Sequence, residues 1–310
     1  MTAQQPPHSP AQSGEGVLIS GCSSGIGRAT AIHLAQRGFT VFASVRKEAD
    51  AEGLRSLKEP NLIPICPLDL TRLDQLPRVV ETVTGELQRR GRNGLYALIN
   101  NAGGGSVAPV ELLDLDKFRI ELETRVLGSV ALVQAFLPMI RRANGRLVWI
   151  MTPATIPTPY VASIHACDFA INCIARTLEI ELERWKIPNV MIRCGGIKTP
   201  AGLRTTTDVE VALRSEPRER VALYERALRA WGKDMAAFDQ KRTDSEKVAA
   251  VVLKALCARQ PKRRYSIGYM AGAAALLEAL PQSLADWILM KRFGGSARES
   301  DPRIRANTRE

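Results

Sequence analysis

Short apolar runs alternate along the chain with longer stretches in which apolar residues recur at helical spacing. This alternation is typical of strand–helix–strand units, in which parallel strands are joined by a crossover helix. We therefore predict a single doubly wound α/β domain with a parallel sheet of about seven strands. The predicted strands are 17–19, 40–45, 62–65, 96–99, 146–150, 190–192 and 264–267.

The amphipathic stretches between these runs predict the helices. Gly38 and Gly91 follow two of them, as expected of residues that end a helix. The predicted helices are 26–37, 73–90, two within 112–140 with the second starting near 119, one from Tyr160 or Ile164 to Trp185, and 280–291. One further helical region precedes the last strand. The domain then spans residues 16–293, between flexible tails at 1–15 and 294–310.

Composition narrows the possible partners. The net charge of +11 would suit an anionic partner, but no nucleic-acid-binding motif accompanies it, so we expect no nucleic acid. The six cysteines form no CxxC pair, which favours free thiols in a reducing compartment and no metal site. The first residues lack the apolar segment of a signal peptide, and no apolar run is long enough to span a bilayer. We therefore expect a cytoplasmic protein.

A glycine-rich turn follows the first strand and opens the first helix. Its sequence is Ser20-Gly21-Cys22-Ser23-Ser24-Gly25-Ile26-Gly27. Glycines let the backbone approach a pyrophosphate closely, and the free N–H groups and positive dipole end of a helix N-terminus stabilise its charge. The strand–turn–helix context predicts a dinucleotide site at this turn.

Several motifs carry a family resemblance. The segment 21–27 resembles the glycine motif of the short-chain dehydrogenase/reductase family, and Asn100-Asn101-Ala102-Gly103 resembles its NNAG motif. Residues 68–70 and 196–200 are similar to two further family segments, although Cys194 stands where proline is usual. Residues 263–268 and 280–287 resemble the retinol/steroid dehydrogenase-like subgroup. The resemblance covers residues 15 to 293 and implies a Rossmann fold that binds a nicotinamide dinucleotide.

The resemblance assigns roles to single residues. Asp69, followed by Leu70, would meet the adenine amino group, and Thr199, preceded by Ile197, would contact the nicotinamide amide. The phosphates would be surrounded by Gly21, Ser23, Ser24, Gly25, Ile26 and Gly27. The adenine ribose would lie against Asn101, Ala102 and Gly103.

The end of the second strand bears on the cofactor preference. An acidic residue there would favour the free ribose hydroxyls of NAD, but this chain has Arg46 followed by Lys47. A guanidinium can pair with a 2′-phosphate through its planar fork. NADP(H) is therefore favoured over NAD(H).

The proton-transfer residues of the family are replaced. Residues 164–182 align without a gap to the helix that holds the family's tyrosine and lysine, and these positions are Ile164 and Asp168 here. The serine position falls at Met151, or at Thr152 with one gap, and the asparagine position falls at Arg125. Isoleucine has no proton to give, and an aspartate would raise the pKa of a neighbouring tyrosine. Arg125 and Asp168 could instead form a buried ion pair.

Other side chains offer alternative proton carriers. Tyr160 could reach the site if the helix were shifted by one turn, with Thr152 as the carbonyl donor, but Ile164 would then stand at the lysine position. His165 titrates near neutral pH, although a lone histidine on a helix is more often structural.

Two functions follow. The first is an NADP(H)-binding pseudoenzyme that acts as a sensor, scaffold or partner subunit. The second is an active NAD(P)-dependent oxidoreductase of a lipophilic alcohol or ketone with a non-standard proton donor. The resemblance also implies a homodimer or a hetero-partner. The apolar C-terminal segment, which ends in Lys291 and Arg292, could cover a substrate cleft, join a partner or contact a membrane surface.

Overall fold

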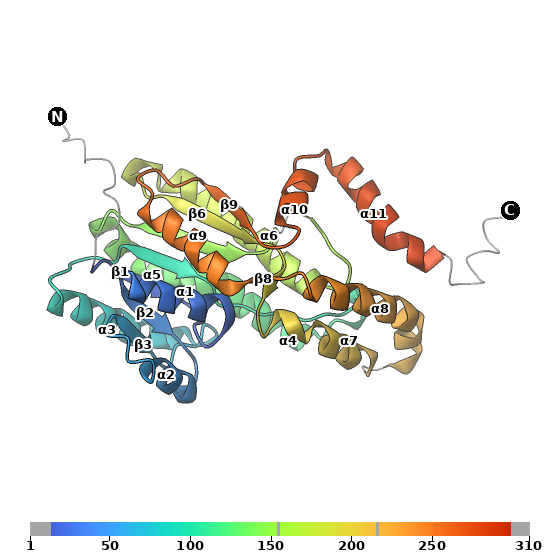
Figure 1. Cartoon of the computed structure of the whole chain (residues 1–310), viewed down its shortest axis with the longest axis horizontal. Coiled ribbons are helices and arrows are strands. Elements are labelled where there is room, and N and C mark those ends of the chain that lie inside the picture. Colours follow the sequence, from blue (N-terminus) through green and yellow to red (C-terminus); the bar gives the residue numbers. More distant parts are fainter. Residues whose placement is uncertain (1–13, 154–155, 215–216, 299–310) are drawn as a thin grey trace.

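A seven-stranded parallel sheet forms the centre of the protein (Figure 1). The structure is a computed structural model and describes residues 14–153, 156–214 and 217–298. The strand order is β3-β2-β1-β4-β5-β6-β9, which confirms the doubly wound fold. The strands are β1 Gly16–Ile19, β2 Thr40–Ser44, β3 Leu62–Ile65, β4 Ala97–Asn100, β5 Arg146–Met151, β6 Asn189–Cys194 and β9 Arg264–Ile267.

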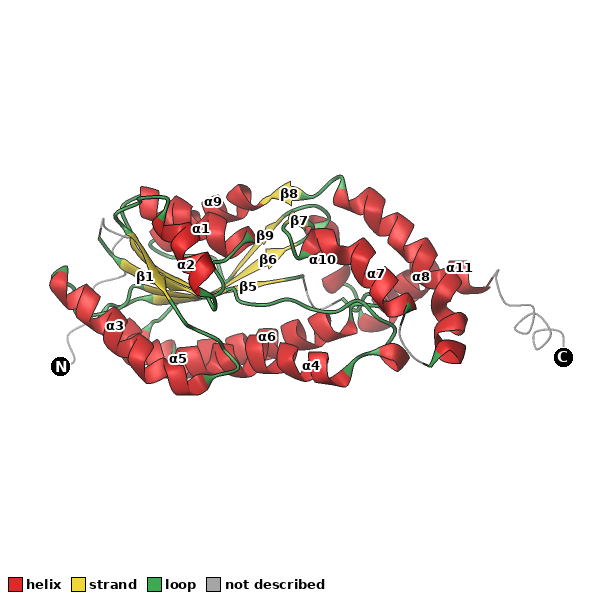
Figure 2. Ribbon diagram, turned by 90° about the horizontal axis from the view of Figure 1, so that it is seen from below, coloured by secondary structure: helices red, strands yellow, loops and turns green. Residues whose placement is uncertain are grey.

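Helices cover both faces of this sheet (Figure 2). One face packs against α1 Gly25–Gln36, α2 Glu48–Arg55 and α9 Ser245–Cys257. The other face packs against α3 Leu76–Arg89, α5 Gly128–Arg142 and α6 Ala162–Glu181. Because each strand is covered on both sides, the central strands are apolar at successive positions, as in the fully buried run Val17, Leu18 and Ile19.

A smaller helical unit lies beyond the carboxyl edge of the sheet. Helices α7 Thr205–Leu213 and α8 Arg218–Asp239 enclose a third apolar cluster with Val107 and Tyr160. A two-stranded parallel pair, β7 Ile197–Lys198 and β8 Thr243–Asp244, flanks this unit. The chain ends in α10 Ala271–Glu278 and α11 Gln282–Arg298. No helix in the described part of the chain is long and apolar enough to cross a membrane.

The structure corrects several predicted boundaries. The segment 112–140 has no break near residue 119, because α4 Leu115–Leu122 continues through a π-helical segment, Glu123–Leu127, into α5. The predicted helix 73–90 begins with a 3₁₀ turn, Leu73–Gln75. The C-terminal segment holds two helices where one was predicted.

Two other predictions concern helix starts and the tails. The long helix begins at Ala162, so a start at Tyr160 is wrong. Of the predicted tails, residues 1–13 and 299–310 lie outside the described residues, and 294–298 belong to α11.

Candidate functional site

The glycine turn and the asparagine turn lie side by side at the carboxyl edge of the sheet. Strands β1 and β4 pair directly, so the turns that follow them meet at the switch point of the strand order. The hydroxyl of Ser20 accepts hydrogen bonds from the N–H groups of Asn101 (2.9 Å) and Ala102 (3.0 Å). The Asn101 amide donates to the carbonyls of Ser20 and Gly21. These bonds fix the two turns as one unit, and no sequence pattern indicates this role of Ser20.

The geometry of the glycine turn suits a phosphate. Gly21 and Gly25 have φ values of +73° and +57°, which side chains rarely adopt. A Cβ at Gly27 would overlap the Gly21 carbonyl and the Asn101 amide. The N-cap of α1, Ser24, makes no side-chain hydrogen bond to the helix, so first-turn N–H groups have no side-chain cap. This turn is the cradle that a pyrophosphate needs.

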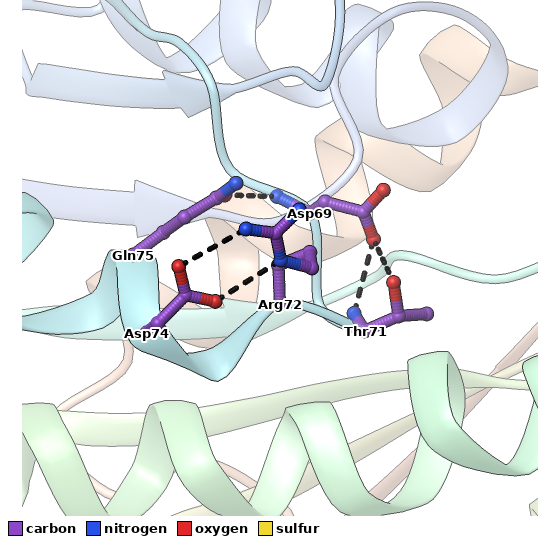
Figure 3. Close-up of polar contacts among 5 residues, drawn as sticks. All are labelled: Asp69, Thr71, Arg72, Asp74 and Gln75. Atoms are coloured by element: carbon purple, nitrogen blue, oxygen red, sulfur yellow. Dashed lines mark hydrogen bonds and ion pairs between the residues drawn. The ribbon is translucent and has the colours of Figure 1, made fainter.

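Local hydrogen bonds hold Asp69, which follows β3, in place (Figure 3). Its Oδ1 accepts from the N–H (3.0 Å) and hydroxyl (2.8 Å) of Thr71, and its own N–H donates to Gln75 (2.8 Å). In Figure 3 the second carboxylate oxygen points away from Thr71. That oxygen is positioned to accept a hydrogen bond from an amino group, while the neighbouring Leu70 is buried in the core.

Arg46 and Thr199 mark two further points of the predicted cofactor site. Arg46 is exposed directly after β2, and Ser44 in that strand accepts a hydrogen bond from the Gly21 N–H (3.3 Å). Thr199 follows β7, and its hydroxyl accepts from the Gly202 N–H (2.9 Å), which leaves the hydroxyl proton free to donate.

An open cleft adjoins the glycine turn. It has a volume of about 560 Å³ and is lined by Gly25 and Thr199 together with the basic residues Arg28 and Lys198. Neither cation was among the residues predicted for the cofactor site. A signal was available, since Arg28 directly follows the glycine motif and Lys198 directly precedes Thr199.

An enclosed ion pair occupies the place of the predicted proton relay. Arg125 lies in the π-helical segment and pairs through Nη2 with Oδ1 of Asp168 on α6, and its Nη1 donates to the Gly104 carbonyl (3.1 Å). The N–H (3.1 Å) and hydroxyl of Thr152 both donate to Oδ2 of Asp168. Only 2% of the Asp168 side chain is exposed. Both carboxylate oxygens are therefore engaged, and the ion pair suggested by the sequence is present.

The remaining family positions carry apolar side chains. Ile164 packs directly on the backbone of Gly105, where a Cβ would overlap its side chain. Met151 is 3% exposed and belongs to the core beneath the sheet. Arg125 lies close to Gly103, within 2.9 Å of where a Cβ would stand. Neither Ile164 nor Met151 carries a proton that could be transferred.

Tyr160 does not lie on the helix, so the one-turn shift considered from the sequence is wrong. Its φ is +68°, and α6 begins two residues later. Its ring packs edge-on against Trp231 of α8, with the ring centroids 5.6 Å apart. Burial raises the pKa of its phenol, so its environment makes Tyr160 a poorer acid.

The other two alternative donors differ in their availability. The hydroxyl of Thr152 donates its proton to a hydrogen bond with Asp168, so it is not available to donate to a substrate carbonyl. Burial lowers the pKa of His165, with a smaller opposing effect from Asp168. Its Nδ1 is buried and has no hydrogen-bond partner among the described residues. Burial therefore favours the neutral form of His165.

Comparison with known proteins establishes the family. The model of the family described as "short chain dehydrogenase" matches residues 15–210. This chain belongs to the short-chain dehydrogenase/reductase family and is of the retinol/steroid dehydrogenase type. It is 29% identical over 293 residues to bovine 11-beta-hydroxysteroid dehydrogenase type 2, covering 89% of this chain and 70% of that protein. It is 29% identical over 279 residues to human retinol dehydrogenase 16, covering 88% of this chain and 87% of that protein.

Solved structures share the fold. A short-chain dehydrogenase from Streptomyces avermitilis superimposes with a TM-score of 0.71 at 22% identity, covering 91% of this chain and 98% of the other. A short-chain dehydrogenase from Burkholderia cenocepacia in complex with NADP has a TM-score of 0.66 at 21% identity, covering 90% and 98%. At this identity the likeness concerns the fold alone.

Proposed function

We propose that this protein binds NADP(H) and acts as a cofactor-dependent sensor, scaffold or partner subunit, without the ordinary proton-coupled hydride transfer of its family. The observation that carries the proposal is the enclosed carboxylate of Asp168. Its two oxygens are taken by Arg125 and Thr152 at the position where the family places a lysine. Ile164 stands at the tyrosine position, so the phenol that donates the proton in the family is missing there.

The residues for holding the cofactor fit the proposal. The first-turn N–H groups of α1 would bind the pyrophosphate, and the free oxygen of Asp69 would accept from the adenine amino group. Arg46, exposed at the end of β2, would pair with a 2′-phosphate. Bound NADPH carries a transferable hydride. One fold neighbour was solved in complex with NADP, so a chain of this fold can hold this cofactor.

Turnover of a lipophilic alcohol or ketone is the second candidate, since the relatives named above are dehydrogenases. The unpartnered Nδ1 of His165 is the observation that favours it. Replacing His165 by Gln would abolish such turnover while leaving NADPH binding intact. If turnover is seen and survives this substitution, Tyr160→Phe tests the remaining phenol.

Cofactor binding and turnover should be measured separately. We expect NADPH fluorescence to increase on binding and NADH to bind more weakly. Arg46→Glu should reverse this order, because it places a negative charge beside the 2′-phosphate. We expect no consumption of NADPH with a panel of steroid, retinoid and aldehyde substrates. Failure to bind NADPH, or turnover of any of these substrates, would contradict the proposal.

A variant that restores the relay tests the cause of inactivity. Ile164→Tyr with Asp168→Lys alone would bury two cations together, because Arg125 would lose its partner. Arg125→Asn and Met151→Ser should therefore be added. We expect this fourfold variant to gain measurable reductase activity over the native chain. If it binds NADPH and stays inactive, the substrate pocket has changed as well as the relay.

A further inference from the structure

A short segment at the carboxyl edge of the sheet brings Thr199 against the glycine turn. The segment runs from Ile197 in β7 to Gly202. The Thr199 side chain comes within 3.1 Å of where a Cβ at Gly25 would stand, so it packs directly on the turn that would hold the pyrophosphate. The place of the Thr199 hydroxyl therefore depends on how this segment is held.

One arginine holds both ends of the segment. Arg242, which lies between α8 and β8, donates from Nη1 to the Ile197 carbonyl (3.4 Å) and from Nη2 to the Gly202 carbonyl (3.3 Å). The N–H of Gly202 in turn donates to the hydroxyl oxygen of Thr199 (2.9 Å). Gly202 thus links the guanidinium of Arg242 to the hydroxyl of Thr199.

The guanidinium is itself fixed in its orientation. Its Nε donates to Oδ1 of Asp239, the last residue of α8 (2.6 Å), and the side chains of this pair are only 12% and 14% exposed. The planar group lies over the Phe238 ring, with Cζ 5.1 Å from the ring centre. A fork held in this way can bind two carbonyls at once, which the compact ammonium of a lysine on its flexible stem cannot match.

Two other hydrogen bonds tie only the start of the segment to the chain around the start of α9. The N–H of Thr243 donates to the Gly196 carbonyl (3.0 Å), and the hydroxyl of Ser245 donates to the Lys198 carbonyl (2.9 Å). Both carbonyls precede Thr199, whereas Arg242 also holds the end that follows it. Loss of the guanidinium would therefore loosen the Gly202 end and leave the start in place.

We propose that Arg242 is a positioning residue for the nicotinamide end of the cofactor. By holding both ends of the segment, it keeps the Thr199 hydroxyl in place to donate to the nicotinamide amide. The adenine end would meet Asp69 and Arg46, which follow β3 and β2 on the opposite side of β1 from β6, so it does not depend on Arg242. This inference rests on the proposed binding of NADP(H) and adds that the end of α8 controls the affinity for the nicotinamide half.

Two ligands separate the two halves of the site. NADPH contains both halves, whereas adenosine 2′,5′-bisphosphate lacks the nicotinamide half. In isothermal titration calorimetry we expect Arg242→Lys to bind NADPH about five- to tenfold more weakly, as for the loss of one hydrogen bond. Its affinity for the bisphosphate should stay at the native value. Arg242→Met removes both donations to the segment and should weaken NADPH binding at least as much.

A double-mutant cycle with Thr199→Val shows whether the arginine acts through the hydroxyl. Thr199→Val alone should weaken NADPH binding by a similar factor. Adding Arg242→Lys should then cause little further loss, because both changes remove the same contact. The matched control is Arg229→Met, since this arginine of α8 pairs only with exposed glutamates. It should bind both ligands like the native chain.

The possible outcomes distinguish this inference from the proposed function. Native NADPH affinity in the Arg242 variants, equal losses for the two ligands, or additive losses in the cycle would overturn the inference while NADP(H) binding stands. If the native chain binds neither ligand, the proposed function fails and this inference fails with it. If Arg242→Met does not fold, Arg242→Lys decides, because it keeps a positive charge beside Asp239.

Discussion

The buried ion pair of Arg125 and Asp168 makes the stability of the protein depend on two single residues. Removing one partner leaves the other charge uncompensated in a site that is nearly closed to water. We expect Arg125→Met or Asp168→Asn to lower the free energy of unfolding by roughly 3 kcal/mol each. The double variant should lose much less than the sum, because neither charge then remains unpaired.

Urea unfolding of the four chains measures this coupling. A control is Arg229→Met, which breaks ion pairs of an exposed arginine on α8 with exposed glutamates of α7 and α8 and should cost less than about 1 kcal/mol. Additive losses in the double variant would show that the pair contributes no interaction of its own.

Gly27 and Gly53 differ in the space around them. A Cβ at Gly27 would overlap the Gly21 carbonyl and the Asn101 amide, so Gly27→Ala should push the two turns apart. We expect this variant to lose NADPH binding by more than about tenfold, because the pyrophosphate cradle depends on this close approach. Gly53 lies inside α2 with open space around it.

Gly53→Ala is therefore the matched control. It should keep NADPH affinity and raise the free energy of unfolding by about 0.5–1 kcal/mol, as alanine favours helix more than glycine does. NADPH titration by fluorescence and thermal unfolding compare the two. Normal NADPH binding by Gly27→Ala would contradict the requirement for this close approach of the two turns.

The sequence could predict which residues occupy the tyrosine and lysine positions of the family, but it could not predict which contacts enclose them. A gapless helix register was enough to place Ile164 and Asp168 and to suggest the partner of Asp168. The contact from Thr152 depends on the path of the loop after β5, and sequence spacing does not determine that path. The bonds of Ser20 likewise join turns that are far apart in sequence.

At the scale of the elements, burial explains which predictions succeeded. The central strands carry apolar residues at successive positions because helices cover both faces, so their runs stand out in the sequence. Helix α2 was not predicted, since only Ala51 and Leu54 of its eight residues are buried and most of the others are charged. The π-helical segment that carries Arg125 has no sequence signature, because it depends on how α4 and this segment pack against α6.

The C-terminal end of α9 shows how a strand stabilises a helix. The hydroxyl of Tyr96, just before β4, donates to the carbonyl of Leu256 in the last turn of α9 (2.7 Å). Arg146 at the start of β5 donates to Ala255 (2.6 Å) and lies over the Tyr96 ring. Together they satisfy carbonyls that have no partner within the helix.

Tyr96→Phe keeps the ring and removes only this hydrogen bond. We expect it to cost about 1–2 kcal/mol of unfolding free energy, because a buried carbonyl loses its donor. Tyr265→Phe is the control, since the Tyr265 hydroxyl accepts from Lys262 at an exposed site. It should change the stability by less than about 0.5 kcal/mol. Equal losses in the two variants, measured by urea unfolding, would argue against a special role for the α9 end.

At the scale of the whole molecule, a buried ion pair joins the C-terminal helix α10, and through it α11, to the sheet. Arg193 of β6 is 3% exposed and makes a two-pronged contact with Glu278 of α10, with Nη2 and Oε1 3.0 Å apart. Asn172 of α6 accepts from the same guanidinium (3.3 Å), and Arg264 lies near Glu278 (3.5 Å). Burial, with Arg264 and Arg176 nearby, lowers the pKa of Arg193 to about 10. The guanidinium therefore needs its carboxylate partner.

Breaking this pair should weaken the attachment of α10 and α11 and should also destabilise the sheet. In Glu278→Ala the charge of Arg193 stays buried without its carboxylate, so we expect a loss of roughly 3 kcal/mol in unfolding free energy and faster proteolytic cleavage between α10 and α11. Arg193→Met with Glu278→Met should recover most of the stability, because the apolar pair needs no counter-ion. If the rate of cleavage rises while the stability in urea stays unchanged, then α10 and α11 are attached through their apolar contacts, and the ion pair only orients them.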